Sequence, residues 1–226
     1  MSLKKLSIGL TAAIATLLGS TANAAVIETV SGWDGTGSIS YFGESNSATY
    51  GQTFLVGADN QLDSWTFYLN DDVDPGYVDF AFYVMDWDSV MNHAVGSVLY
   101  QSSAVSTTNN NGLDGMEAFT FNTGGLNLTS GNDYIAFISA TGLFDGITGT
   151  ASAGSLLNEN AYLDGGFFWQ NNGNSTGTWD TQSWNSLPNF GDLAFTASFS
   201  SVPEPASAAL LGLGLAGIGL ARRRKA

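Results

Sequence analysis

The sequence predicts an all-β protein, a single antiparallel β-sandwich of jelly-roll type that lies between two terminal targeting segments. Three observations predict this fold. Aromatic and β-branched residues alternate with period two along the chain, Gly, Asn and Asp turn signals separate these stretches, and no helical period is visible between residues 25 and 201. Such a composition favours strands. About ten short strands in one domain are typical of a sandwich.

The expected strands are, in chain order, 26–30, 38–42, 50–56, 62–69, 77–87, 97–102, a stretch around Phe119 and Phe121, 133–139, 161–169 and a stretch around 195–199. Trp65 shares one face of its strand with every second residue, and we assign this ring to the core. The strand at 77–87 is apolar on both faces. Turn signals such as Asp74-Pro75-Gly76 and Asn111-Gly112 separate the strands.

One local pattern supports a sandwich. Leu126-x-Leu128-x-x-Gly131-x-x-Tyr134 opens the strand expected at 133–139. It resembles the corner of many sandwiches, in which a tyrosine hydroxyl bonds back to the preceding turn. We therefore expect a structural role for Tyr134.

The N-terminus, residues 1–24, has the three parts of a secretory signal peptide. Lys4 and Lys5 form the positive region, and residues 6–18 form an apolar region too short to span a membrane. Ala22-Asn23-Ala24 is a small-x-small site, so signal peptidase is expected to cut after Ala24. The chain has no cysteine, which excludes lipoprotein modification and a disulfide framework.

The C-terminal residues 202–226 form a second targeting segment. Pro203, Glu204 and Pro205 form a stiff, extended stretch, because proline restricts both itself and the residue before it. The apolar run at 206–221 would rise about 24 Å as a transmembrane helix at about 1.5 Å per residue. Snorkelling arginines can extend it toward a hydrocarbon core of about 30 Å. The basic end, Arg222, Arg223, Arg224 and Lys225, is expected to stay cytoplasmic.

This segment resembles the PEP-CTERM sorting signal, because the motif at 202–205, the glycine- and leucine-rich run and the arginine cluster occur in that order. The resemblance implies processing at Pro203-Glu204-Pro205 by an exosortase, a membrane peptidase-transferase of Gram-negative bacteria that make extracellular polysaccharide. A plain C-terminal anchor is the alternative. The Leu-Pro-x-Thr-Gly motif of a sortase tail is absent. The stretches 51–54, 62–68 and 119–126 also resemble secreted β-sandwich bodies that often carry this signal, which implies a fold and no active residues.

The region between the targeting segments, 25–201, is expected to be one acidic domain. All 6 Lys and Arg residues lie in the targeting segments, and of the 20 acidic residues only Glu204 does. The domain therefore carries nineteen acidic residues and neither Lys nor Arg. Nucleic acid and anionic lipid should repel it. Its carboxylates must be solvated, hydrogen-bonded or bound to cations.

The residues offer little for catalysis, and we expect no enzyme and no catalytic residue. His93 is the single histidine, and no nucleophile-elbow pattern accompanies it. Phosphoryl transfer lacks both a P-loop and a cationic clamp. A secreted hydrolase that uses two carboxylates is the remaining catalytic alternative.

Two kinds of binding site are expected instead. Asp71, Asp72 and Asp74 crowd one turn, and Asp86 and Asp88 flank Trp87 at a strand end. Oxygen-only clusters suit calcium, although Asp and Asn also serve simply as turn formers. Trp169, Trp179 and Trp184 lie in polar, Asn- and Gly-rich surroundings and are candidates to stack on sugar rings, although most sandwich tryptophans are packing residues.

Taken together, these patterns predict an exported protein. It would be anchored transiently in the inner membrane, and an exosortase would then transfer it to the cell surface or extracellular matrix of a Gram-negative bacterium. There it would act as a structural or interaction protein of the polysaccharide matrix or biofilm. The alternative is a lectin-like glycan-binding module, with or without a requirement for calcium.

Overall fold

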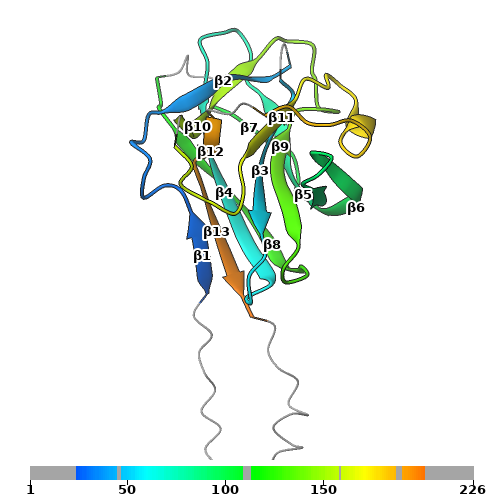
Figure 1. Cartoon of the computed structure of the whole chain (residues 1–226). Helices are drawn as coiled ribbons and strands as arrows, with labels where there is room; N and C mark the ends of the chain where they lie inside the picture. Colours follow the sequence, from blue (N-terminus) through cyan, green and yellow to red (C-terminus); the bar gives the residue numbers. More distant parts are fainter. Residues whose placement is uncertain (1–23, 45–46, 109–112, 158, 187–189, 202–226) are drawn as a thin grey trace, which may run out of the picture.

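The strand-forming residues between the two targeting segments build two antiparallel sheets that pack face to face (Figure 1). The computed structural model describes residues 24–44, 47–108, 113–157, 159–186 and 190–201. The predicted signal peptide up to residue 23 and the sorting segment from 202 onward lie outside these ranges. No helix in the ranges described is long and apolar enough to cross a membrane.

The first sheet has the strand order β1-β13-β4-β10-β12, with β2 also paired to β10 and β8 to β4. Its strands are β1 (Ala25–Glu28), β2 (Ser38–Gly43), β4 (Gln61–Asp71), β8 (Glu117–Asn127), β10 (Thr150–Leu157), β12 (Phe190–Leu193) and β13 (Phe195–Ser200). The second sheet has the order β11-β3-β9-β5-β6, with β7 paired to β5. Its strands are β3 (Thr49–Leu55), β5 (Asp79–Asp88), β6 (His93–Gln101), β7 (Val105–Ser106), β9 (Asp133–Ser139) and β11 (Phe167–Gln170).

The expected β-sandwich is confirmed, and the finer expectation of a jelly-roll connection stays a prediction. Most predicted strands are present within a few residues of the expected bounds. β7, β10 and β12 are not predicted by the sequence pattern, and the strand predicted at 161–169 is present only as β11 at Phe167–Gln170. The turn expected around residues 70–74 is partly strand, because β4 continues to Asp71.

The main core lies between the sheets and is rich in aromatic rings. Trp65 of β4 is fully buried, as predicted, and stacks on Phe195 of β13 with ring centroids 4.7 Å apart and an angle of 9° between planes. Phe54 and Phe82 approach the same indole from the second sheet. The predicted tyrosine corner is also confirmed, because the Tyr134 hydroxyl accepts a hydrogen bond of 2.9 Å from the Thr129 backbone N–H.

A second aromatic cluster covers the outer face of the β11-β3-β9-β5-β6 sheet. The residues of β5 that point away from the main core, among them Tyr83, Met85 and Trp87, meet Ile135 and Phe137 of β9 there. The segment after β11 folds over them through the short 3-10 turn η1 (Thr176–Thr178). This explains why β5 is apolar on both faces, and it provides the floor of the pocket described next.

Candidate functional site

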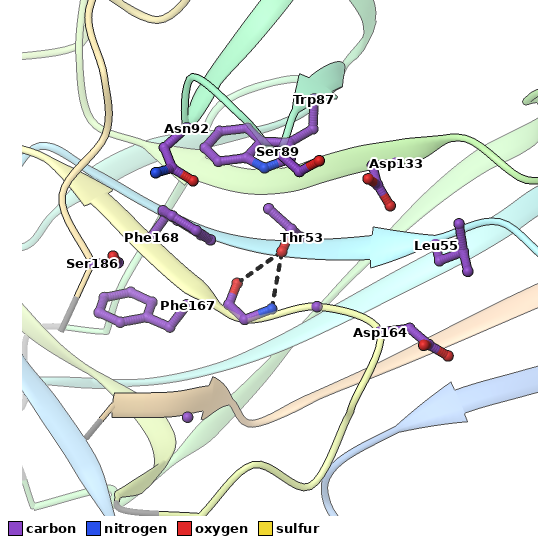
Figure 2. A pocket seen from close by; sticks show the side chains of 13 residues that line it. Thr53, Leu55, Trp87, Ser89, Asn92, Asp133, Asp164, Phe167, Phe168 and Ser186 are labelled. Carbon is purple, nitrogen blue, oxygen red and sulfur yellow. Dashed lines mark hydrogen bonds between the residues drawn. The ribbon is translucent and has the colours of Figure 1, made fainter. Parts of the chain in front are cut away.

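A polar and aromatic pocket with a volume of about 430 Å³ lies beside the second cluster (Figure 2). Trp87 from β5 and Phe168 from β11 form its aromatic wall, with ring centroids 4.7 Å apart and 55° between the planes. Asp133 from β9 and Asp164 from the loop before β11 lie on opposite sides of β3. We call this the Trp87–Phe168 pocket. The remaining lining residues are Thr53, Leu55, Ser89, Asn92, Gly165, Gly166, Phe167, Ser186 and Gly191.

Glycine permits the close approach that brings the Asp164 loop to β3. A Cβ added at Gly165 would lie 1.9 Å from the backbone oxygen of Thr53, so no other residue fits without a backbone shift. The next residue, Gly166, exchanges hydrogen bonds with Thr53. The Thr53 N–H donates to its carbonyl at 2.9 Å, and its own N–H donates to Thr53 Oγ1 at 2.9 Å. The loop is therefore fixed along the strand edge, and Asp164 is held at the mouth of the pocket.

A buried carboxylate supports this loop from behind. Asp192 is 1% exposed, and it accepts hydrogen bonds from Gln52 Nε2 at 2.8 Å and from the Tyr162 backbone N–H at 2.9 Å. Burial raises the pKa of Asp192, and these hydrogen bonds act in the opposite direction. Gln52 also accepts from the Leu193 N–H at 2.9 Å. The network links β3, β12 and the loop, so the pocket stands on a rigid base.

A second hollow of about 430 Å³ adjoins the pocket at Trp87. Asp86, Asp88 and Asp133 line it, so the carboxylates on the two sides of the indole form one acidic surface. The domain has neither Lys nor Arg to neutralise them. A neutral or cationic ligand is compatible with this charge, whereas an anionic ligand would meet no basic side chain other than His93.

The structure places the predicted calcium residues in separate hydrogen-bonded positions. Asp72 accepts from Ser152 Oγ at 2.7 Å, and Asp74 accepts from the Thr150 N–H and hydroxyl at 2.7 Å each. Within the described ranges no group of three or more His, Asp or Glu side chains is arranged to hold a metal ion. Calcium binding at these positions therefore stays a prediction.

Asp88 stabilises the turn that follows β5, which is the turn-forming role expected as the alternative to calcium binding. Its Oδ1 accepts the backbone N–H groups of Val90 at 2.8 Å and Met91 at 2.9 Å, and these bonds lower the pKa of Asp88. Asp86 lines the hollow beside Trp87. The turn thus occupies Oδ1 of Asp88.

Asp71 is the exception among these acids, because it is buried with one oxygen unpaired. The side chain is 4% exposed, Oδ1 accepts from Thr107 Oγ1 at 2.7 Å, and Oδ2 has no hydrogen-bond partner. Burial, reinforced by the charges of Asp74, Asp72 and Glu117, raises the pKa of Asp71 to about 6, against the lowering effect of the Thr107 bond.

The three tryptophans predicted to bind sugar are placed differently from what their polar surroundings suggested. Trp179 and Trp184 are 4% and 3% exposed and pack on Phe137 in the second cluster. Their indole N–H groups donate to Thr49 Oγ1 and to the Trp179 carbonyl. In this structure neither ring is free to stack on a ligand. Trp169 is half-buried against Phe167, with the two rings stacked.

The pocket residues were missed because they alternate with core residues. Phe168 lies between two other aromatic residues, and Trp87 follows the apolar run of β5, so the sequence does not show that the two rings meet on the outer face of the sheet. The one sequence signal near the pocket is Asp164-Gly165-Gly166, because adjacent glycines permit the close approach to Thr53.

These features define an all-β domain that is followed by a C-terminal sorting segment. The family model described as the PEP-CTERM protein-sorting motif matches residues 201–225. The resemblance seen in the sequence is confirmed: residues 201–225 carry a PEP-CTERM protein-sorting motif. The motif implies an exosortase as processing partner and implies export with a membrane-anchored sorting signal.

The sandwich itself has no comparably informative relative. No curated protein matches the chain significantly. Among solved structures, the crystal structure of the cysteine protease and lectin-like domains of Cwp84, a surface layer associated protein of Clostridium difficile, is similar with a TM-score of 0.43 and 11% identity. The match covers 73% of this chain and 36% of that one, so this chain spans about a third of that structure. A similarity of this extent carries no argument about function.

Proposed function

We propose that the protein is exported, released from its membrane anchor by an exosortase, and retained at the cell surface or in the extracellular matrix as an interaction protein. The sorting motif at 201–225 is the observation that carries this proposal. The domain composition agrees with it. A cysteine-free domain without Lys or Arg suits an oxidising, polysaccharide-rich exterior and repels anionic lipid once it is free.

Cell fractionation tests this proposal in the native host. The wild-type domain should occur in the surface and medium fractions. In a strain that lacks the exosortase, or in a Pro203→Ala, Pro205→Ala variant, it should accumulate in the inner membrane with its basic end intact. Identical distributions in all three strains would contradict the proposal.

A second candidate function, glycan binding, is favoured by the Trp87–Phe168 pocket. Sugar sites combine an aromatic surface with nearby polar acceptors, and this pocket offers half-buried Phe168 beside Asp133, Asp164 and Asn92. Because the only charges lining it are negative, neutral or amino-substituted saccharides are the expected class. We propose a binding role and no catalytic step.

Titration with neutral, amino-substituted and acidic oligosaccharides tests this second function. Trp87 lies in the wall, so ligand binding should change the intrinsic tryptophan fluorescence. Phe168→Ala should abolish the change, while Leu163→Ala, which alters an 81% exposed side chain in the preceding loop, should preserve it. Thermal melts of each variant separate lost binding from lost folding. Saturable binding that Phe168→Ala leaves unchanged would remove the pocket as the site.

A further inference from the structure

Both chain ends leave the sandwich at the same pole (Figure 1). β1 begins at Ala25, and this residue pairs with Phe199, next to the end of β13 at Ser200. The loops after β3 and before β9 lie at the same pole and are bonded to each other. The Leu128 N–H donates to the Asn60 carbonyl at 2.8 Å, and the Val56 N–H donates to the Asn132 carbonyl at 3.1 Å. We call residues 25, 56–60, 128–133 and 200–201 the terminal pole.

Almost no chain separates the terminal pole from the sorting motif. The strand ends at Ser200, and the motif match begins at residue 201. The apolar run starts at 206, so six residue steps at ~3.3–3.6 Å bridge at most ~20 Å between the fold and the hydrocarbon. The headgroup layer takes up roughly 5–7 Å of this length. In the anchored precursor the terminal pole must therefore lie at the membrane surface.

The end of β13 is too well fixed to supply extra length. Ser200 pairs with Gln61 of β4, and its Oγ donates to Gln61 Oε1 at 3.2 Å and to Asp63 Oδ1 at 3.1 Å. Lengthening the tether would require unpairing β13 from β4, and the adjacent Phe199 is 4% exposed in the core. The enzyme that cleaves the motif therefore lies close to the folded terminal pole.

The charge of the terminal pole indicates what kind of surface it fits. Asp59 and Asp133 lie there, Asp63 lies beside it, and the domain has neither Lys nor Arg to offset them. Anionic phospholipid headgroups would repel this surface. A basic protein surface beside the cleavage site would attract it instead.

We propose that the terminal pole is a docking surface for the exosortase, which holds the motif in its active site through basic groups that face Asp59 and Asp133. This rests on the proposed function, because it assigns a second contact to the enzyme that the sorting motif implies. The domain is then part of the substrate that the enzyme recognises. Cleavage releases the acidic domain from the membrane.

Charge reversal tests the docking surface in the full chain, expressed in its host and followed by pulse-chase of C-terminal cleavage. Asp59→Lys with Asp133→Lys should slow cleavage about tenfold. Asp145→Lys with Asp180→Lys, which changes two exposed acids in the 140–149 loop and after η1 by the same net charge, should not slow it. A linker of ten Gly and Ser residues inserted after Ser201 should remove the difference between the two double variants. Thermal melts of the released domains confirm folding.

Each other outcome has one meaning. Equal rates for the two double variants without the linker would overturn docking. Faster cleavage of the Asp59 and Asp133 variant would also overturn it and would assign the pole to anionic lipid, which Lys attracts. A wild-type chain that keeps residues 202–226 would overturn the proposed function itself, and this inference with it.

Discussion

The buried carboxyl of Asp71 should make the domain less stable at pH 7.5 than at pH 5. The pKa of Asp71 is raised from 3.8 to about 6 by burial and by neighbouring carboxylates. The folded state therefore keeps the proton to a higher pH than the unfolded state does. Stability that is present below pH 4 is lost as the pH rises through 6.

The magnitude follows from these two pKa values. Between pH 5.0 and pH 7.5 the factor by which protonation of Asp71 raises the folding equilibrium constant falls about tenfold, which corresponds to about 1.4 kcal/mol of folding free energy. Screening by water and relaxation of the neighbours reduce this, so we expect about 1 kcal/mol from Asp71. The raised pKa of Asp192 adds a change of the same sign.

Asp71→Asn isolates the contribution of Asp71, because the amide keeps the acceptor for Thr107 Oγ1 and cannot ionise. Urea unfolding of residues 25–201 at the two pH values should show a smaller pH-dependent loss for Asp71→Asn than for the wild type, by about 1 kcal/mol. Asp180→Asn changes an exposed acid and should follow the wild type. Parallel pH dependence of the wild type and Asp71→Asn would refute the reasoning.

Three further stability predictions concern packing and the corner, and each is measured by urea unfolding. Trp65→Ala should lower the free energy of unfolding by about 3–5 kcal/mol, because it empties a fully buried site between the sheets. Leu163→Ala on the surface is the control and should change stability by less than about 0.5 kcal/mol. A loss below about 1 kcal/mol for Trp65→Ala would contradict the described core. Tyr134→Phe should cost about 1–2 kcal/mol through the lost acceptor for the Thr129 N–H, and an unchanged midpoint would show that the corner contributes nothing. Gly154→Val should cost about 1–3 kcal/mol of stability, because the new Cβ would lie 2.8 Å from the Trp33 ring. Gly57→Val is the control, because the space around Gly57 is open. Equal effects of the two substitutions would argue against the described packing of β10.

The sequence predicted the aromatic strands well and the small-residue strand not at all. β4, β5 and β9 carry bulky residues with a clear period of two, and their predicted bounds are close to the observed ones. β10 reads Thr-Ala-Ser-Ala-Gly-Ser-Leu-Leu and pairs with β2, β4 and β12. The Trp33 indole packs against Gly154 of this strand, so the large side chain that fills the space there comes from another segment of the chain. A pattern in one stretch cannot contain this information.

The same reason limits prediction of the site. Trp179 and Trp184 occur among polar residues, and their burial depends on Tyr83 and Phe137, which β5 and β9 present on the outer face of their sheet. Asp71 and Asp72 are neighbours in the sequence, but the alternation of the strand buries Asp71 at 4% exposure and directs Asp72 to Ser152. The C-terminal sorting motif could be read directly, because it depends on the local order of residues and not on tertiary contacts.

The intact mass of the mature protein, recovered from the envelope and medium of its native host, tests the central claim most directly. We predict a chain that begins at Ala25 and ends within Pro203-Glu204-Pro205, either bare or with an added group that identifies the acceptor. A mass that includes Arg222 to Lys225 would show an ordinary membrane anchor and would contradict exosortase processing.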